Sequence, residues 1–152
     1  MATIKPTITL TANASTAGTS PGPLSMALSL SATDNLTVDR VHSETKVLGT
    51  AVVKILDGSD LLATDSDNGT PGTHGGFLYL KNISATDLDV YCAFAADGDT
   101  SELASNDDAD RHFSLKQNEF AWVPWDYTGD FIARGEAADS KLEYWLFNRA
   151  NA

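Results

Sequence analysis

Apolar and polar residues alternate with a period of two in several stretches of this chain, which is the pattern of half-buried β-strands. The strictest alternation runs over 24–31, where every second residue is leucine or methionine and the residues between are serine or alanine. Ile8 and Leu10 alternate with threonine in the same way, and Pro6 confines a strand there to an edge or to a strand start. We therefore predict an N-terminal strand or arm over Thr3–Thr11 and another strand over 24–31, separated by a turn-rich stretch.

The rest of the chain continues in short runs. Residues 36–56 favour two strands that divide near Ser43–Lys46, because a glycine and several β-branched residues count against a helix. Between 77 and 149, six apolar runs are separated by Asn, Asp, Gly and Ser: FLYLKN, LDVYCAFA, RHFSL, EFAWVPW, DFIARG and LEYWLFNR. We expect the first two runs, Phe77–Asn82 and Leu88–Ala95, to form a hairpin, and residues 101–104 to form one helical turn.

The alternation also assigns residues to a core. Six side chains are predicted to be buried: Leu80, Val90, Cys92, Phe94, Phe120 and Leu146. The strands near the C-terminus, however, are apolar on both faces, and such a strand requires a partner on each side. The second partner is either another layer of the fold or another copy of the protein.

Together these runs predict an all-β protein: a single antiparallel β-sandwich, jelly-roll-like, with an extended N-terminal arm. The length of 152 residues suits one domain with its own core. We assign residues 1–23 to the arm and linker and residues 24–152 to the sandwich. The loop over 63–76 is rich in Asp, Gly and Thr, and loops of that length are usually functional, interfacial or mobile.

The net charge of −11 is concentrated in the middle of the chain. Residues 57–110 contain twelve acidic side chains and one basic side chain, Lys81, whereas the remainder is balanced. This surface repels phosphate backbones, so we expect no nucleic-acid partner. The first twelve residues lack the apolar core of a signal peptide, and no run approaches the roughly 20 apolar residues of a membrane helix. We therefore expect a cytosolic product without a membrane partner.

Catalytic motifs are sparse. An activated serine or cysteine needs a neighbouring base, and the three histidines, His42, His74 and His112, are scattered. The chain has no G-x-S-x-G motif, and its histidine spacing does not match the clustered metal site of a cupin. Cys92 alternates with apolar neighbours and is expected to be a buried thiol. We expect no enzymatic activity.

Two acidic loops contain clusters of oxygen ligands that resemble the start of a calcium-binding loop. Asp65 and Asp67 precede a turn glycine, and Asp97 and Asp99 flank another. The first glycine comes one position early for an EF-hand, and no glutamate closes the loop. These four aspartates are the candidate ligands for Ca²⁺. The alternative is a pair of solvated acidic loops, and no other cofactor is expected.

Four short motifs follow one another in the C-terminal half: LKNIS at Leu80–Ser84, LKQNEFAWVP at Leu115–Pro124, IARG at Ile132–Gly135 and LEYWLFN at Leu142–Asn148. In this order they resemble small structural proteins of tailed bacteriophages. The resemblance implies a β-sandwich topology and a role in the virion, and it offers no catalytic residues. Among virion components, a small acidic all-β protein is similar to the decoration or cement proteins, which bind the assembled capsid as trimers or dimers.

The leading functional hypothesis is therefore a capsid decoration protein on the exterior of the virion, made in the host cytoplasm. Its expected partners are the major capsid protein and further copies of itself, as a homotrimer. The interface candidates are Ile4, Ile8 and Leu10 in the arm and Trp122, Trp125 and Trp145 in the strands that are apolar on both faces. The alternatives are a tail, neck or head-fibre component, or a Ca²⁺-dependent carbohydrate-binding module whose aromatic residues stack on sugar rings.

Overall fold

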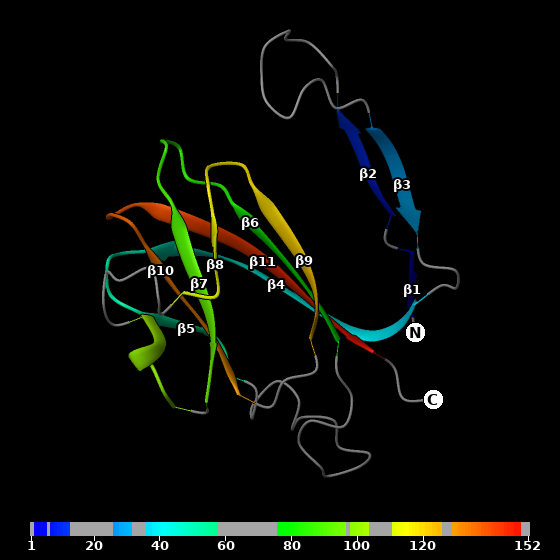
Figure 1. The fold of residues 1–152 in the computed structure, drawn as a ribbon. Coiled ribbons are helices and arrows are strands. Elements are labelled where there is room, and N and C mark those ends of the chain that lie inside the picture. Colours follow the sequence, from blue (N-terminus) through cyan, green and yellow to red (C-terminus); the bar gives the residue numbers. More distant parts are fainter. Residues whose placement is uncertain are drawn as a thin grey trace, which may run out of the picture. The chain divides into compact units, whose positions relative to one another are not determined.

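The fold is all-β in a computed structural model that describes residues 2–5, 7–12, 26–31, 36–57, 76–96, 98–103, 111–125 and 129–149. Contacts within the chain divide it into two units, Met1–Val38 and Asp39–Ala152, which are described separately. The described elements are β1 (Ala2–Ile4), β2 (Thr7–Ala12), β3 (Met26–Ser31), β4 (Leu36–Leu48), β5 (Val53–Leu56), β6 (Gly76–Asn82), β7 (Val90–Ala95), the 3₁₀ turn η1 (Ser101–Leu103), β8 (Phe113–Leu115), β9 (Phe120–Trp125), β10 (Asp130–Gly135) and β11 (Ser140–Arg149) (Figure 1).

The first unit consists of short antiparallel pairs. β1 pairs with the first three residues of β4, and β2 pairs with β3 in a register that sets Ile8 opposite Leu30 and Leu10 opposite Leu28. The strand expected over Thr3–Thr11 is thus two strands, and the break falls at Lys5, next to the proline. A proline cannot donate a ladder hydrogen bond, which is consistent with this interruption. The predicted boundary between arm and sandwich after residue 23 stays a prediction.

The second unit contains two four-stranded antiparallel sheets. The first sheet has the order β4–β11–β6–β9 and the second has the order β5–β10–β7–β8 (Figure 1). The pairs β7–β8, β6–β9, β5–β10 and β4–β11 are nested in the sequence. In the sequence, the two strands of each pair in this list flank the two strands of the pair before it, and successive pairs alternate between the two sheets.

One hydrophobic core joins the inner faces of the two sheets. The first sheet contributes alternate residues of β6 and β11, and the second contributes alternate residues of β7 and β10; the buried members include Leu78, Leu80, Leu142, Tyr144, Leu146, Val90, Cys92, Phe131 and Ala133. A core shared in this way defines a β-sandwich. The predicted burial of Leu80, Val90, Cys92 and Leu146 is confirmed. Phe94 is only partly buried, packed against the core.

The predicted burial of Phe120 is wrong, because 55% of this residue is exposed. Its neighbours Ala121 and Val123 are the β9 residues that pack against the core. The alternation in β9 was therefore recognised, but the core was assigned to the wrong face. Phe120 and Trp122 lie on the outer face of the first sheet.

The predicted hairpin of Phe77–Asn82 with Leu88–Ala95 is also wrong, because β6 and β7 lie in different sheets. The side chain of Asn82 fixes this crossing. Its Nδ2 donates to the carbonyl oxygens of Leu88 (2.7 Å) and Leu115 (2.8 Å), and its Oδ1 accepts from the Ser84 backbone (3.0 Å) and hydroxyl (2.6 Å). The Ser84 hydroxyl accepts in turn from the backbone N–H of Lys141. The LKNIS motif thus links the two sheets through buried hydrogen bonds.

The division expected near Ser43–Lys46 is wrong as well, since β4 continues to Leu48 and the break falls at 49–52. The polar residues that suggested a turn are side chains of a strand. Within the second unit, β4 and β9 are the edge strands of the first sheet. An edge strand tolerates polar residues that a central strand would not. The expected helical turn is confirmed as η1, with Leu103 buried.

Candidate interaction surface

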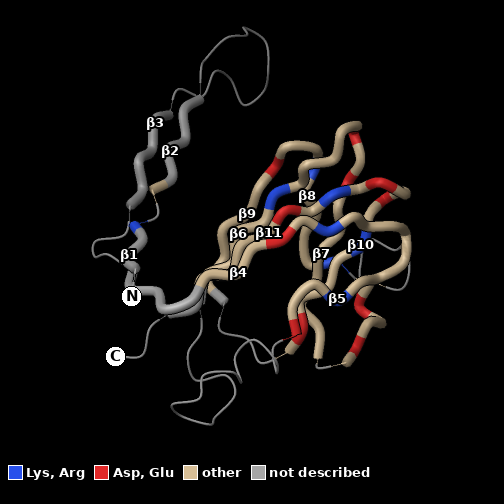
Figure 2. The backbone as a smooth tube through the Cα atoms, turned by 180° about the vertical axis from the view of Figure 1, so that it is seen from behind, with Lys and Arg blue, Asp and Glu red and all other residues tan. Residues whose placement is uncertain are grey.

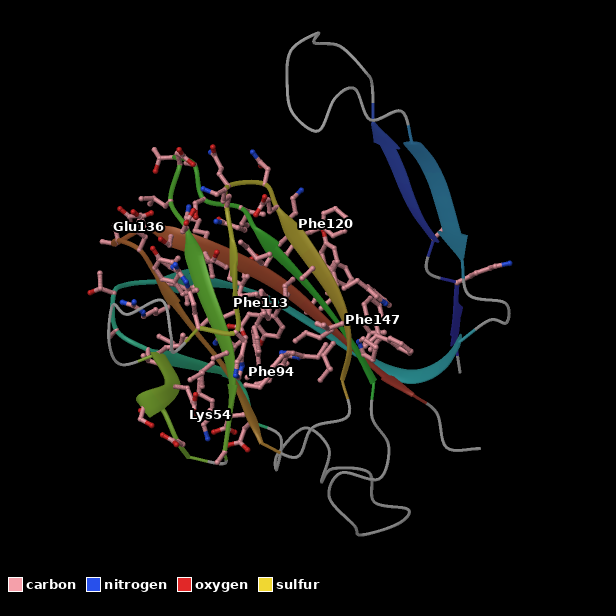
Figure 3. All side chains as sticks on the ribbon, in the orientation of Figure 1. Lys54, Phe94, Phe113, Phe120, Glu136 and Phe147 are labelled. Atoms are coloured by element: carbon pink, nitrogen blue, oxygen red, sulfur yellow. The ribbon has the colours of Figure 1, made fainter. Side chains whose placement is uncertain are left out.

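The outer face of the first sheet carries six aromatic residues, which we call the aromatic face: Phe77, Tyr79, Phe120, Trp122, Trp145 and Phe147. Successive residues of a strand point to opposite sides of a sheet, and the residues between these six belong to the core. The register sets Trp145 opposite Tyr79 and Tyr79 opposite Trp122, so one row of aromatic residues crosses β11, β6 and β9. Figure 3 shows Phe120 and Phe147 on the side of the sandwich away from Phe94 and Phe113.

The rings of the aromatic face contact one another. The ring centroid of Trp122 lies 5.6 Å from that of Phe77 and 5.4 Å from that of Phe147. The Phe147 ring lies 6.3 Å from the ring of Trp145, with an angle of 14° between the planes. Such neighbours stiffen one another, because each ring restricts the rotamers of the next. The result is a surface of aromatic rings held largely in place before any partner binds.

Exposure varies across this face. Phe77 is buried beneath its neighbours, whereas Trp145 is 37% exposed and Phe120, stacked at 6.2 Å on Tyr79, is 55% exposed. Exposed apolar side chains that lie together on a soluble domain are typical of binding surfaces. The aromatic face thus exposes apolar surface at Phe120 and at Trp145, while Phe77 is covered by the neighbouring rings.

Trp145 is fixed by a hydrogen bond. Its indole Nε1 donates to Oε1 of Glu143 over 2.9 Å. The same carboxylate lies near Tyr79, whose pKa is raised by burial and, to a smaller extent, by the negative charge of Glu143. Tyr79 is therefore a neutral phenol at physiological pH, and the indole of Trp145 has its polar group satisfied within the protein.

An open groove of about 260 Å³ lies beside Trp145, lined by Ser43, Glu44, Thr45, Glu143 and Trp145. It joins β4 to β11 at the edge of the aromatic face. Its lining combines the aromatic ring of Trp145, the carboxylate of Glu143 and the hydroxyls of Ser43 and Thr45. Val47, which is 63% exposed, lies two residues farther along β4.

A polar network occupies the other side of β4. The hydroxyl of the buried residue Tyr144 donates to Oε2 of Glu44 over 2.9 Å and contacts Nε2 of His42 at 3.2 Å, while Lys46 Nζ lies 2.7 Å from Oε1 of Glu44. The hydrogen bonds from Lys46 and Tyr144 lower the pKa of Glu44. Burial and the neighbouring carboxylate raise the pKa of Tyr144. The Tyr144 phenol therefore stays protonated. Its hydroxyl group, at the edge of the core, has Glu44 and His42 as hydrogen-bond partners.

A second polar cluster surrounds Asp130, which is fully buried. Its Oδ2 accepts from Nζ of Lys54 (2.8 Å) and from the backbone of Gly98 (2.9 Å), and Lys54 also contacts Asp57 at 2.9 Å. Hydrogen bonds to Asp130 and Asp57 raise the pKa of Lys54. Lys54 in β5 therefore stays charged and paired with Asp130 in β10 (Figure 3), and Asp130 in turn binds the turn before η1 at Gly98.

The residues predicted as sites have different outcomes. Trp122 and Trp145 lie together on the aromatic face, whereas the side chains of Ile4, Ile8, Leu10 and Trp125 lie outside the described part. Asp65, Asp67 and Asp97 also lie outside the described residues. Asp99 accepts a hydrogen bond from the Ser101 backbone over 2.8 Å, which with the Ser101 hydroxyl lowers its pKa. In the structure, Asp99 therefore stabilises the turn that begins η1.

Four members of the aromatic face were missed as interface candidates: Phe77, Tyr79, Phe120 and Phe147. The sequence contained a signal for Phe77, Tyr79 and Phe147, because they alternate with the correctly predicted core residues Leu80 and Leu146, whereas Phe120 was itself assigned to the core. His112, one of the three scattered histidines, accepts the Phe94 N–H at Nδ1 over 2.9 Å. The predicted burial of Cys92 has a chemical consequence, because burial raises the pKa of its thiol.

Among the residues that the structure describes, no three His, Cys, Asp or Glu side chains come together as metal ligands. The described segments also include no helix with the length and hydropathy needed to cross a bilayer. Comparisons of the chain with protein-family models, curated proteins and solved structures give no match.

Proposed function

We propose that this protein is a virion structural protein, a capsid decoration protein that binds the outside of a bacteriophage head through its aromatic face. The observation that carries the proposal is the position of this face on a sandwich whose core is already complete. Trp145 and Phe120 add little to that core, yet they are exposed together with stacked neighbours. Tryptophan and tyrosine are the residues that most often dominate protein–protein binding energy.

The strand order supports a finer part of the proposal, namely that the sandwich is a jelly roll. That fold consists of eight antiparallel strands in two sheets. The eight strands from β4 to β11 have nested pairing, with the first next to the eighth and the second next to the seventh. Rolling up one long hairpin yields this order.

The charge distribution supports binding to the exterior of the capsid. Acidic residues of the described part lie mostly in the loops that join the strands (Figure 2). Acidic loops repel packaged nucleic acid, and they are compatible with a solvent-facing position on a particle. The aromatic face carries six aromatic residues and is suited to a protein partner.

The N-terminal unit supports the proposal of an arm and of a homotrimer. A ribbon of only two strands, such as β2–β3, is marginally stable alone, and its register sets apolar residues opposite one another. In the proposed assembly, the apolar residues of this ribbon lie against a neighbouring subunit or the capsid. Three linked copies would strengthen a weak capsid contact through effective concentration.

Carbohydrate binding is a second candidate, favoured by the small angles between rings of the aromatic face. The Trp145 and Phe147 planes differ by 14°, and flat aromatic surfaces stack on sugar rings. In this alternative, Ca²⁺ bound by Asp65, Asp67, Asp97 or Asp99 would order the loops. A tail, neck or head-fibre role differs from decoration in copy number, since decoration requires hundreds of copies per particle.

The test is co-sedimentation with capsids assembled without this protein. Wild-type protein is expected to sediment with them, and the double variant Phe120→Ala, Trp122→Ala is expected to bind at least about 30-fold more weakly. Tyr91→Ala is the control, because it truncates an aromatic residue of the second sheet. Wild-type protein that fails to bind such capsids refutes the decoration role. Equal losses in the double variant and the control would remove the aromatic face from the interface.

A further inference from the structure

The groove beside Trp145 has a composition that the other parts of the aromatic face lack. Its walls are Ser43, Glu44, Thr45, Glu143 and Trp145, with an open volume of about 260 Å³. The indole N–H of Trp145 already donates to Glu143, so what the exposed part of Trp145 offers a ligand is mainly its aromatic surface. A ligand here meets a ring and a carboxylate side by side.

The charge of the groove is negative. Its lining includes the carboxylate of Glu143 and neither lysine nor arginine. The Glu44 carboxylate lies on the other side of β4, where it is bound by Lys46 and Tyr144. The register sets Lys81 opposite Glu143, but no ion pair joins these two described side chains within 4.0 Å. The Glu143 carboxylate therefore has capacity for a further donor.

We infer that this groove binds an arginine side chain of the protein partner, an inference that rests on the proposed function. A guanidinium group can stack on the indole of Trp145 while its N–H groups donate to Glu143. Its positive charge complements the lining and the net charge of −11, which attracts basic surfaces over a distance. The volume suits one side chain, so the groove would hold an anchor residue at the rim of the aromatic face.

A sugar is the competing ligand, because a pyranose also stacks on tryptophan. Sugar hydroxyls both donate and accept hydrogen bonds, and carboxylates only accept. In this groove the side-chain donors are the hydroxyls of Ser43 and Thr45, while the carboxylate of Glu143 favours a ligand that donates. An arginine side chain donates at all five of its N–H groups, so the lining fits it better.

The experiment is an NMR titration of the full chain that follows the indole N–H signal of Trp145, assigned with the variant Trp145→Phe. The probe is the peptide acetyl-Gly-Arg-Gly-amide, and the same peptide with citrulline in place of arginine removes the charge. We expect a saturable shift with the arginine peptide and at least about tenfold weaker binding of the citrulline peptide. Raising the salt concentration from about 0.05 M to about 0.5 M is expected to weaken the binding.

Variants separate the groove from general attraction to an acidic protein. Glu143→Gln is expected to lower the affinity for the arginine peptide about tenfold, and Asp87→Asn, an equal charge change in an exposed loop, by less than twofold. Equal effects of the two variants would overturn the inference, as would saturable binding of glucose or galactose without binding of the arginine peptide. Capsid co-sedimentation is scored separately. Capsid binding without peptide binding refutes the groove alone, and peptide binding without capsid binding refutes the decoration role alone.

Discussion

Replacing Phe120 by alanine tests on which face of the first sheet this residue lies. Complete burial of a phenylalanine stabilises a fold by about 1.5–3 kcal/mol, and 45% of Phe120 is buried (100% minus 55%), which gives about 1 kcal/mol. The stacked contact with Tyr79 adds about 0.2–1 kcal/mol. No cavity forms at an exposed site, so Phe120→Ala should lower the free energy of unfolding by about 1–2 kcal/mol.

Phe131 is the matched reference, because it is fully buried between the sheets and packs on the rings of Phe94 and Phe113. Its replacement by alanine leaves a cavity and should cost about 3–5 kcal/mol. Urea denaturation followed by circular dichroism measures both free energies on the same scale. A loss of 3 kcal/mol or more for Phe120→Ala, equal to that of Phe131→Ala, would refute the assignment of Phe120 to the outer face.

Further substitutions probe single contacts. Gly135→Ala should cost about 1–3 kcal/mol in urea denaturation, because an added Cβ would lie 2.5 Å from Cβ of Ser140. Asn82→Ala should cost about 2–4 kcal/mol, since it leaves the buried carbonyl oxygen of Leu115 and the partly buried one of Leu88 without their donor. Cys92 should react with a thiol reagent only after unfolding, as its pKa is raised and it is fully buried. Because the pKa of Tyr144 is higher in the folded than in the unfolded state, this residue contributes stability below pH 10.0. That contribution is lost as the pH rises above 10.0, where the unfolded phenol ionises first. Tyr144→Phe should therefore reduce the fall in the free energy of unfolding at alkaline pH.

The sequence predicted where strands occur better than it predicted which strands pair. A period of two is a local property, and it located the strands around Leu80, Val90 and Leu146. The partner of a strand depends on distant residues. The crossing between the sheets after Asn82 depends on hydrogen bonds to Leu88 and Leu115, and a linear pattern does not reveal them.

The aromatic face was harder to predict because both faces of β9 are apolar. Hydrophobicity favours burial of Phe120 and Trp122, the larger pair, over Ala121 and Val123. The structure has the opposite arrangement, since the small residues face the core. Space in the core explains this choice. The second sheet already fills the layer between the sheets with the rings of Phe131, Phe113 and Phe94, and a close-packed interior has no room for further large side chains.

This arrangement connects the fold to the proposed binding. The first sheet fills its side of the core with leucines and Tyr144, so its other aromatic residues can lie on the outer face without loss of packing. The parts of Phe120 and Trp145 that remain exposed can then contribute hydrophobic free energy to association with a partner. The stacked rings lower the entropy lost on binding, because their rotamers are already restricted. A stable sandwich with an exposed, preorganised aromatic face is thus suited to binding a second protein surface.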